Sequence, residues 1–142
     1  MQENNPDSLV YAVFTREKTQ QHEKFEMIGI VGVHRKTPIA ELGYIFHPSV
    51  WNQGYASEAL LTFLNLFWKL RPRVEVVEAV TDYENYASQR VLMRCGFREV
   101  KRLKEKAIIV TKGPEKRDAI VFEKQAPSYT FDINDSIGMH TY

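Results

Sequence analysis

A glycine that joins an apolar run to an amphipathic run is the feature that most constrains this fold. The segment at residues 51–60, WNQGYASEAL, links the end of a predicted strand to the start of a predicted helix. The first turn of a helix leaves main-chain N–H groups without partners and carries partial positive charge. Residues 53–57 could therefore cradle a phosphate, with Gly54 allowing close approach. A tight strand-to-helix turn that binds nothing fits the same residues equally well.

Length and charge set the class of protein. With 142 residues, 44% of them hydrophobic and 26% charged, the chain has room for one globular core. Nineteen basic and eighteen acidic residues give a formal net charge of +1, so no bulk attraction to nucleic acid or to an anionic membrane is expected. We predict a single domain over residues 1–142, with a C-terminal tail at 127–142 that has no clear period.

The cysteine count and the N-terminus indicate the compartment. Cys95 is the single cysteine, which leaves no internal disulfide and no CxxC pair. The polar N-terminus lacks the features of a signal peptide, and no apolar run approaches membrane-spanning length. The four histidines are scattered without ligand spacing, so no metal site is expected. We expect a cytoplasmic protein that binds neither membrane nor nucleic acid.

The first third of the chain predicts an antiparallel meander. Its strands alternate apolar and polar residues and are rich in β-formers, at residues 8–15, 26–35 and 40–47. Residues 16–24 are charged and predict a hairpin loop, and Pro38 lies in the second connection.

Helices flank one further strand in the middle of the chain. Apolar residues three and four apart predict a helix at 54–70, which Arg71 and Pro72 end. The strand at 74–81 is β-branched, as a buried parallel strand would be. The remaining predicted elements are a helix from Asn85 to Gly96, strands at 98–110 and 117–124, and a hairpin loop at 111–116.

Three sequence segments occur in this order of elements. They are ELGYIFHPSVWNQGYASEAL at 41–60, the quartet Asn85-Tyr86-Ala87-Ser88, and Arg90-Val91-Leu92 leading to Cys95-Gly96-Phe97. Together with the element order, they resemble the GCN5-related N-acetyltransferase (GNAT) superfamily, and most strongly its branch of ribosomal-protein N-terminal acetyltransferases. Their joint order is far more specific than any one of them.

The resemblance implies an α/β (α+β) fold with a mixed, mostly antiparallel twisted sheet, two main helices and a splayed strand pair. It implies that acetyl-CoA binds with its pyrophosphate on the helix start and its pantetheine arm between the splayed strands. The cofactor residues implied are the main chain of Ile45, Phe46 and His47, the loop of Gln53, Gly54, Tyr55, Ala56 and Ser57, and the side chain of Asn85. The implied reaction is direct acetyl transfer to the primary amine of a protein N-terminus, a peptide or a small molecule.

Ser88 is the residue that the resemblance makes the general acid. In the family the matching serine can protonate the leaving thiolate of CoA, a task that other branches give to a tyrosine one turn later, where this chain has Leu92. A thiolate with a pKa of about 8.5 needs little such help. The alternative reading makes Asn85 a plain helix N-cap and Ser88 a residue that closes the first turn.

The general base is open among several residues. Glu41 begins the strand before the glycine turn, where histone-acetylating relatives place their catalytic glutamate, and His47 lies where the strands should splay. The ordinary alternative for Glu41, an exposed strand-start carboxylate, is the favoured one, and His47 is as easily a plain strand-end residue. Glu105 ranks third. Cys95 lies at a helix end beside Gly96, with no positioned partner, so we expect it to pack rather than act as a nucleophile.

The front of the chain departs from the family pattern. Family members begin with a strand and one or two helices before the first strand seen here, and these normally line the acceptor side. We expect this chain to lack them, which leaves a non-catalytic CoA-binding or interaction module as the alternative function. The first strand would then be an exposed edge, so we expect a homodimer through that strand or through the C-terminal tail.

Overall fold

The computed structural model describes residues 8–34, 39–108 and 116–128. Within them the chain forms six strands and two α-helices. In chain order the elements are β1 (Leu9–Lys18), β2 (Glu23–Val33), β3 (Ile39–Phe46), a 3₁₀ turn (Pro48–Val50), α1 (Tyr55–Leu70), β4 (Val76–Asp82), α2 (Tyr86–Arg94), β5 (Arg98–Ile108) and β6 (Lys116–Gln125). The predicted loop at 111–116 lies outside the described residues apart from Lys116.

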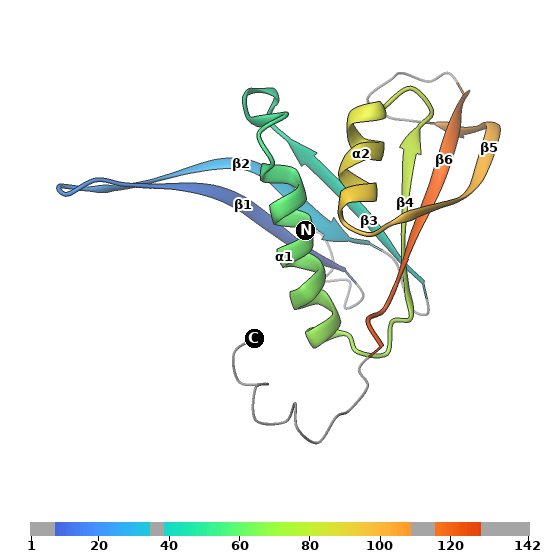
Figure 1. The fold of residues 1–142 in the computed structure, drawn as a ribbon, viewed down its shortest axis with the longest axis horizontal. Helices are drawn as coiled ribbons and strands as arrows, with labels where there is room; N and C mark the ends of the chain where they lie inside the picture. Colours follow the sequence, from blue (N-terminus) through green and yellow to red (C-terminus); the bar gives the residue numbers. More distant parts are fainter. Residues whose placement is uncertain (1–7, 35–38, 109–115, 129–142) are drawn as a thin grey trace, which may run out of the picture.

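The strands form one mixed sheet in the order β1-β2-β3-β4-β6-β5 (Figure 1). All neighbours are antiparallel except β3 and β4, which are parallel and joined through α1. The predicted meander, the parallel strand after the first helix and the mostly antiparallel α/β architecture are therefore confirmed.

The predicted hairpin is confirmed, but its loop is shorter than the predicted 16–24, because β1 runs to Lys18 and β2 begins at Glu23. Arg16 pairs with Phe25 and Lys18 with Glu23, so only residues 19–22 lie outside the ladder. Thr19 closes this short turn: its N–H donates to the carbonyl of His22 at 2.8 Å, and its hydroxyl accepts from the His22 N–H at 3.1 Å. Charged side chains fit a ladder that has water on both faces.

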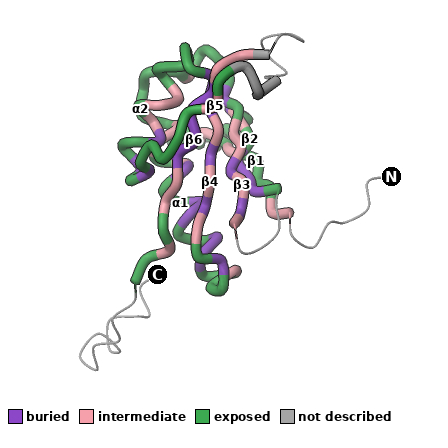
Figure 2. Tube along the Cα trace, turned by 90° about the vertical axis from the view of Figure 1, so that its right-hand side faces the viewer, coloured by how far each residue is buried: buried purple, intermediate pink, exposed green. Residues whose placement is uncertain are grey.

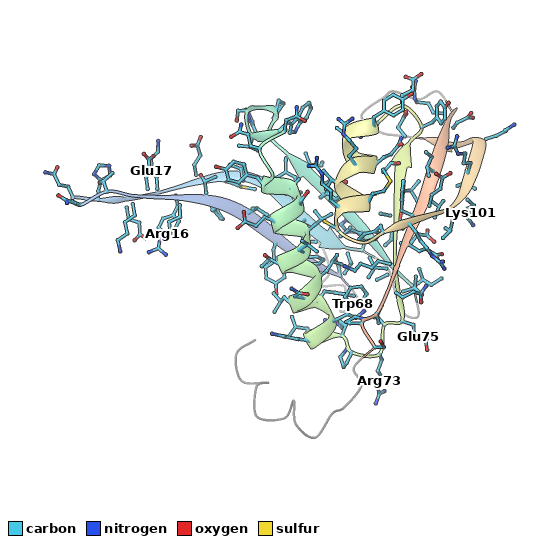
Figure 3. All side chains as sticks on the ribbon, in the orientation of Figure 1. Arg16, Glu17, Trp68, Arg73, Glu75 and Lys101 are labelled. Atoms are coloured by element: carbon cyan, nitrogen blue, oxygen red, sulfur yellow. The ribbon has the colours of Figure 1, made fainter. Side chains whose placement is uncertain are left out.

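The hairpin forms an arm that leaves the body of the molecule (Figure 1). β2 pairs with β3 only over Gly29–Val33, so its outer part is paired with β1 alone. Figure 3 shows Arg16 and Glu17 pointing to opposite sides of this arm, as neighbouring strand residues do. We call residues 14–27 the arm.

The core lies between the sheet and the two helices. The buried side of α1, at the three-and-four spacing that the sequence predicts, consists of Leu60, Phe63, Leu64, Phe67 and Trp68. These residues join one cluster with buried positions of the sheet and of α2, such as Leu42, Ala79, Leu92 and Phe122. Both helices therefore pack on the same face, and the buried positions follow the central strands and the inner sides of the helices (Figure 2).

The two parallel strands pair for only part of their length. Residues Ile39–Leu42 of β3 align with Val76–Ala79 of β4, and the pairing ends there. β3 continues to Phe46 and β4 to Asp82, so the two strands part beyond this point. This is the predicted splayed strand pair, and α2 begins directly beside it.

Candidate functional site

A cavity of about 180 Å³ lies where β3 and β4 part, beside the first turn of α2. Its apolar lining includes Leu42, Ala79 and Leu92, and its polar lining consists of Tyr44, Thr81, Asp82, Asn85 and Ser88. Two residues predicted from the sequence, Asn85 and Ser88, thus meet in this cavity. Tyr44, Thr81 and Asp82 were not predicted as site residues.

Asn85 caps α2 and lies next to Ser88. Its side-chain oxygen accepts from the Ser88 N–H at 3.1 Å, and its own N–H donates to the Asp82 carbonyl at 3.0 Å. An N-cap of this kind satisfies one of the free N–H groups of the first turn. The capping interpretation is therefore correct, and it leaves the amide N–H₂ of Asn85 available at the mouth of the cavity.

Tyr44 reaches across the cavity from β3 to α2. Its hydroxyl lies within hydrogen-bond distance of both the Ser88 hydroxyl and, at 3.3 Å, the Ser88 carbonyl, and its single hydrogen can be donated to either oxygen. Burial raises the pKa of Tyr44 to about 12, and the hydrogen bond with Ser88 offsets part of that rise. The phenol therefore stays neutral and able to donate at physiological pH. When it donates to the Ser88 oxygen, the serine hydrogen is free to point at a ligand.

Asp82 is the carboxylate of the cavity, and both of its oxygens already have partners within the chain. The residue is 3% exposed, one oxygen accepts from the Glu84 N–H at 2.8 Å, and the other pairs with Arg117. Arg117 also reaches Glu84 at 3.0 Å, so the three side chains tie the end of β4 to the start of β6. This network holds the wall of the cavity, and its carboxylate is a poor candidate for a general base.

The turn before α1 has the geometry of an anion cradle. Gly54 is the N-cap with φ of 83°, a left-handed conformation that favours glycine, and a Cβ built there would meet no atom within 4 Å. The first intrahelical bond runs from the Glu58 N–H to Gly54, so the N–H groups of residues 55–57 precede the helical ladder. Gln53 bonds to the Ser49 carbonyl at 2.8 Å and fixes the turn.

At the end of β3, successive main-chain N–H groups point alternately toward β2 and toward the splay. The His47 N–H donates to the Ile28 carbonyl at 2.8 Å, which marks His47, and by alternation Ile45, as residues facing β2. Phe46 therefore faces the splay, and its carbonyl accepts from the Trp51 ring N–H at 2.8 Å. Of the three residues predicted for main-chain contact with the pantetheine arm, Phe46 is the one with its N–H on that side.

The candidate bases lie outside the cavity. Glu41 is half-buried and alternates with Leu42, so it lies on the sheet face away from the helices. His47 lines a second cavity, of about 450 Å³, between the arm and the turn before α1. Its Nδ1 accepts from the Ser49 N–H at 3.1 Å, which leaves Nε2 as the exposed ring nitrogen. The side chain of Glu105 lies outside the described part of the chain.

Cys95 packs in the core, as the sequence predicts. It is 1% exposed, and its thiol lies 3.5 Å from the Ser57 carbonyl, where it joins the start of α1 to the end of α2. Burial raises the pKa of this thiol, which disfavours the nucleophilic thiolate. Across residues 8–34, 39–108 and 116–128, no helix has the length and apolarity to cross a membrane, and no three acidic, histidine or cysteine side chains gather to hold a metal ion.

Comparison with known proteins places this chain in a family. A family model described as an acetyltransferase (GNAT) domain matches residues 1–98. An uncharacterized N-acetyltransferase of Bacillus subtilis, YoaA, is 30% identical over 83 residues, which are 56% of this chain and 46% of that protein. The match thus spans about half the length of this curated relative.

Solved structures share the fold. A putative ribosomal-protein-serine acetyltransferase from Vibrio cholerae is 27% identical, with a TM-score of 0.65 over 85% of this chain and 66% of that one. The microcin C7 self-immunity acetyltransferase MccE, solved in complex with acetyl-CoA and AMP, is similar in fold alone. It is 15% identical, with a TM-score of 0.66 over 85% of this chain and 62% of that one.

Proposed function

Because the chain belongs to the acetyltransferase (GNAT) domain family, we propose that it transfers the acetyl group of acetyl-CoA to a primary amine. The observation that carries the proposal is the cavity at the splay of β3 and β4, where Tyr44, Asn85 and Ser88 converge. The acceptor would be a protein N-terminus, a peptide or a small amine.

The turn before α1 supports binding of the CoA diphosphate. The N–H groups of Tyr55, Ala56 and Ser57 precede the helical ladder, and the space beside Gly54 is open. An oxyanion bound there gains hydrogen bonds and the favourable end of the helix dipole. Asn85 and the Phe46 N–H would then hold the pantetheine arm, which enters between the strands.

Ser88 is proposed as the group that protonates the leaving thiolate. Acetyl transfer forms a C–N bond and breaks the C–S bond of the thioester, which leaves a thiolate that accepts one proton. We propose that Tyr44 donates its single hydrogen to the Ser88 hydroxyl oxygen during the reaction, which leaves the serine hydrogen for the cavity and polarises the serine as a donor. Tyr44 is thus a positioning residue for Ser88.

The amine must lose a proton before or during attack, and Glu41 and His47 remain the proposed bases. Neither lines the cavity at the splay, so either would act on an amine that approaches from outside it or through a water molecule. The one described carboxylate of the cavity, Asp82, is engaged by Arg117, so the cavity offers no free carboxylate as a base. This lack of a base within the described part of the cavity favours the second candidate function, a CoA-binding module without turnover.

We also propose that a second copy of the chain covers its apolar sheet face. Val10, Phe14, Ile30 and Ile45 are 49%, 53%, 38% and 63% exposed. Their strand positions place them on the face away from the helices, and β1 is one of the two edge strands of the sheet. Apolar patches and unpaired edges of this kind favour association. The C-terminal tail at 127–142, the other predicted dimer contact, lies outside the described part of the chain apart from Pro127 and Ser128. The single cysteine supports a cytoplasmic location.

The test of the proposed activity is mass spectrometry of amine pools incubated with acetyl-CoA. Peptides with free N-termini and polyamines should be assayed in parallel with wild type and Ser88→Ala. An acetylated product that forms faster with wild type supports the enzyme. CoA binding without acetylation of any pool favours the binding module.

A further inference from the structure

Thr81 is the unusual polar residue of the cavity at the splay. It lies on β4, is 6% exposed, and its hydroxyl has no hydrogen-bond partner within the described residues. The neighbouring polar side chains are engaged: Tyr44 with Ser88, Asn85 with the Ser88 N–H, and Asp82 with the Glu84 N–H. Among the polar side chains that line the cavity, Thr81 is therefore the buried one whose hydrogen-bonding capacity the fold leaves unused.

A buried hydroxyl without a partner makes the fold less stable. Valine has nearly the same shape as threonine, favours strands equally and would bury no polar atom at this position. The fold alone therefore gives no reason for threonine at 81. In native proteins a buried polar group of this kind calls for an explanation, and a ligand that enters the cavity is one.

The place of Thr81 indicates which part of a ligand it would meet. It lies two residues beyond Ala79, the last residue of β4 that aligns with β3, and so at the opening of the splay. The phosphate cradle lies at the start of α1, on a different element. A hydroxyl both donates and accepts, and rotation about Cα–Cβ exchanges it with the methyl group, so it can turn toward a group in the cavity.

We propose that the Thr81 hydroxyl hydrogen-bonds to the acyl-pantetheine chain of CoA. This inference rests on the proposed function, since it takes CoA as the ligand of the cavity. The chain offers amide N–H and C=O groups along its length, and a threonine hydroxyl can pair with either kind. The Thr81 hydroxyl would therefore contribute to binding of the pantetheine arm. It would not contribute to binding of the nucleotide part, which the turn at Gly54 would hold.

The test compares the affinities of CoA and of 3′-phosphoadenosine 5′-diphosphate, which lacks the pantetheine arm, for wild type and Thr81→Val. We expect Thr81→Val to bind CoA roughly tenfold more weakly, the size of one ordinary hydrogen bond. Its affinity for the nucleotide should equal that of wild type. Without ligand, Thr81→Val should melt at the same or a higher temperature, because the unpaired hydroxyl is gone.

Two further variants complete the design. Thr81→Ser keeps a hydroxyl and should restore CoA affinity. Thr62→Val makes the same chemical change on the exposed side of α1, where the Thr62 hydroxyl donates to the Glu58 carbonyl at 2.9 Å, and it should leave CoA affinity unchanged.

Three outcomes would overturn the inference: equal CoA affinity of Thr81→Val and wild type, equal weakening toward CoA and the nucleotide, or a lower melting temperature of Thr81→Val without ligand. A lower melting temperature would show that the Thr81 hydroxyl already has a hydrogen-bond partner within the fold. If wild type binds neither compound, the proposed function fails as well, and that result is distinct from the other three.

Discussion

The hydroxyl of Tyr44 on β3 hydrogen-bonds to the hydroxyl of Ser88 in the first turn of α2. The two residues are 44 positions apart in sequence, and their contact spans the opening between the parallel strands. It places the Tyr44 phenol in the cavity that holds the proposed proton donor. The contact therefore predicts that Tyr44 positions the Ser88 hydroxyl for proton donation.

Removal of either hydroxyl should slow acetyl transfer, and the two effects should not add. We expect Ser88→Ala to lower kcat by about a hundredfold, the lower end of the range for loss of a general acid, with little change in KM for acetyl-CoA. Tyr44→Phe should lower kcat by less, and should have no further effect in the Ser88→Ala background. The measurement is steady-state kinetics over the double-mutant cycle. Additive effects would show that Tyr44 acts through packing alone.

The raised pKa of Tyr44 predicts a loss of stability at high pH. Burial lifts this pKa from 10.0 to about 12, so folding is favoured while the phenol is neutral. As pH rises above about 10, the unfolded state ionises first, and the free energy of unfolding falls until the folded pKa is passed. Between these pH values wild type should lose up to about 1.4 kcal/mol per pH unit more than Tyr44→Phe. Parallel curves from denaturant titrations would contradict this reading.

Asn85→Ala should affect both stability and ligand binding. Loss of the cap on Ser88 should cost about 1 kcal/mol of unfolding free energy. CoA should also bind more weakly. Asn85→Ser is the matched control, because serine caps a helix well but lacks the amide N–H₂ group. Calorimetry should show CoA binding weakened in both variants and stability lowered mainly in Asn85→Ala. Unchanged CoA affinity in both would reduce Asn85 to a helix cap.

The apolar face predicts self-association. Sedimentation of wild type at micromolar concentration should reveal a dimer, and the double variant Val10→Lys with Ile45→Lys should be monomeric, because charged side chains then replace two exposed apolar ones. Leu61→Lys is a control on α1, where the residue is 40% exposed, and should leave the dimer intact. A wild type that stays monomeric and soluble would refute the proposed partner.

Local patterns predicted the parts of this fold that local rules determine. The spacing of Phe63, Leu64 and Phe67 gave the buried side of α1, and Gly54 gave the turn before it. Asn85 gave the cap of α2. The charged residues 16–24 correctly predict a hairpin but too long a loop, because charged residues also pair in a ladder that has solvent on both faces and a compact turn at Thr19.

The cavity itself could be predicted only in part. Tyr44 shares strand parity with Leu42 and Phe46, so its direction toward the helices was readable, but its contact with Ser88 depends on where α2 packs. Thr81 and Asp82 gain their roles from the parting of β3 and β4 and from Arg117, a distant residue on β6. Single-sequence patterns carry no signal for such long-range contacts.

Amide hydrogen exchange with and without CoA tests the central claim most directly, because it needs no knowledge of the acceptor. Exchange should slow in peptides that cover residues 53–58, 43–47 and 85–88, and should be unchanged in the arm. In Gly54→Asn, which retains a left-handed conformation more easily than other substitutions, the slowing at 53–58 should be lost. Unchanged exchange at these three segments, or slowing confined to the arm, would contradict the assignment of the splayed strands and the turn at Gly54 as the acetyl-CoA site.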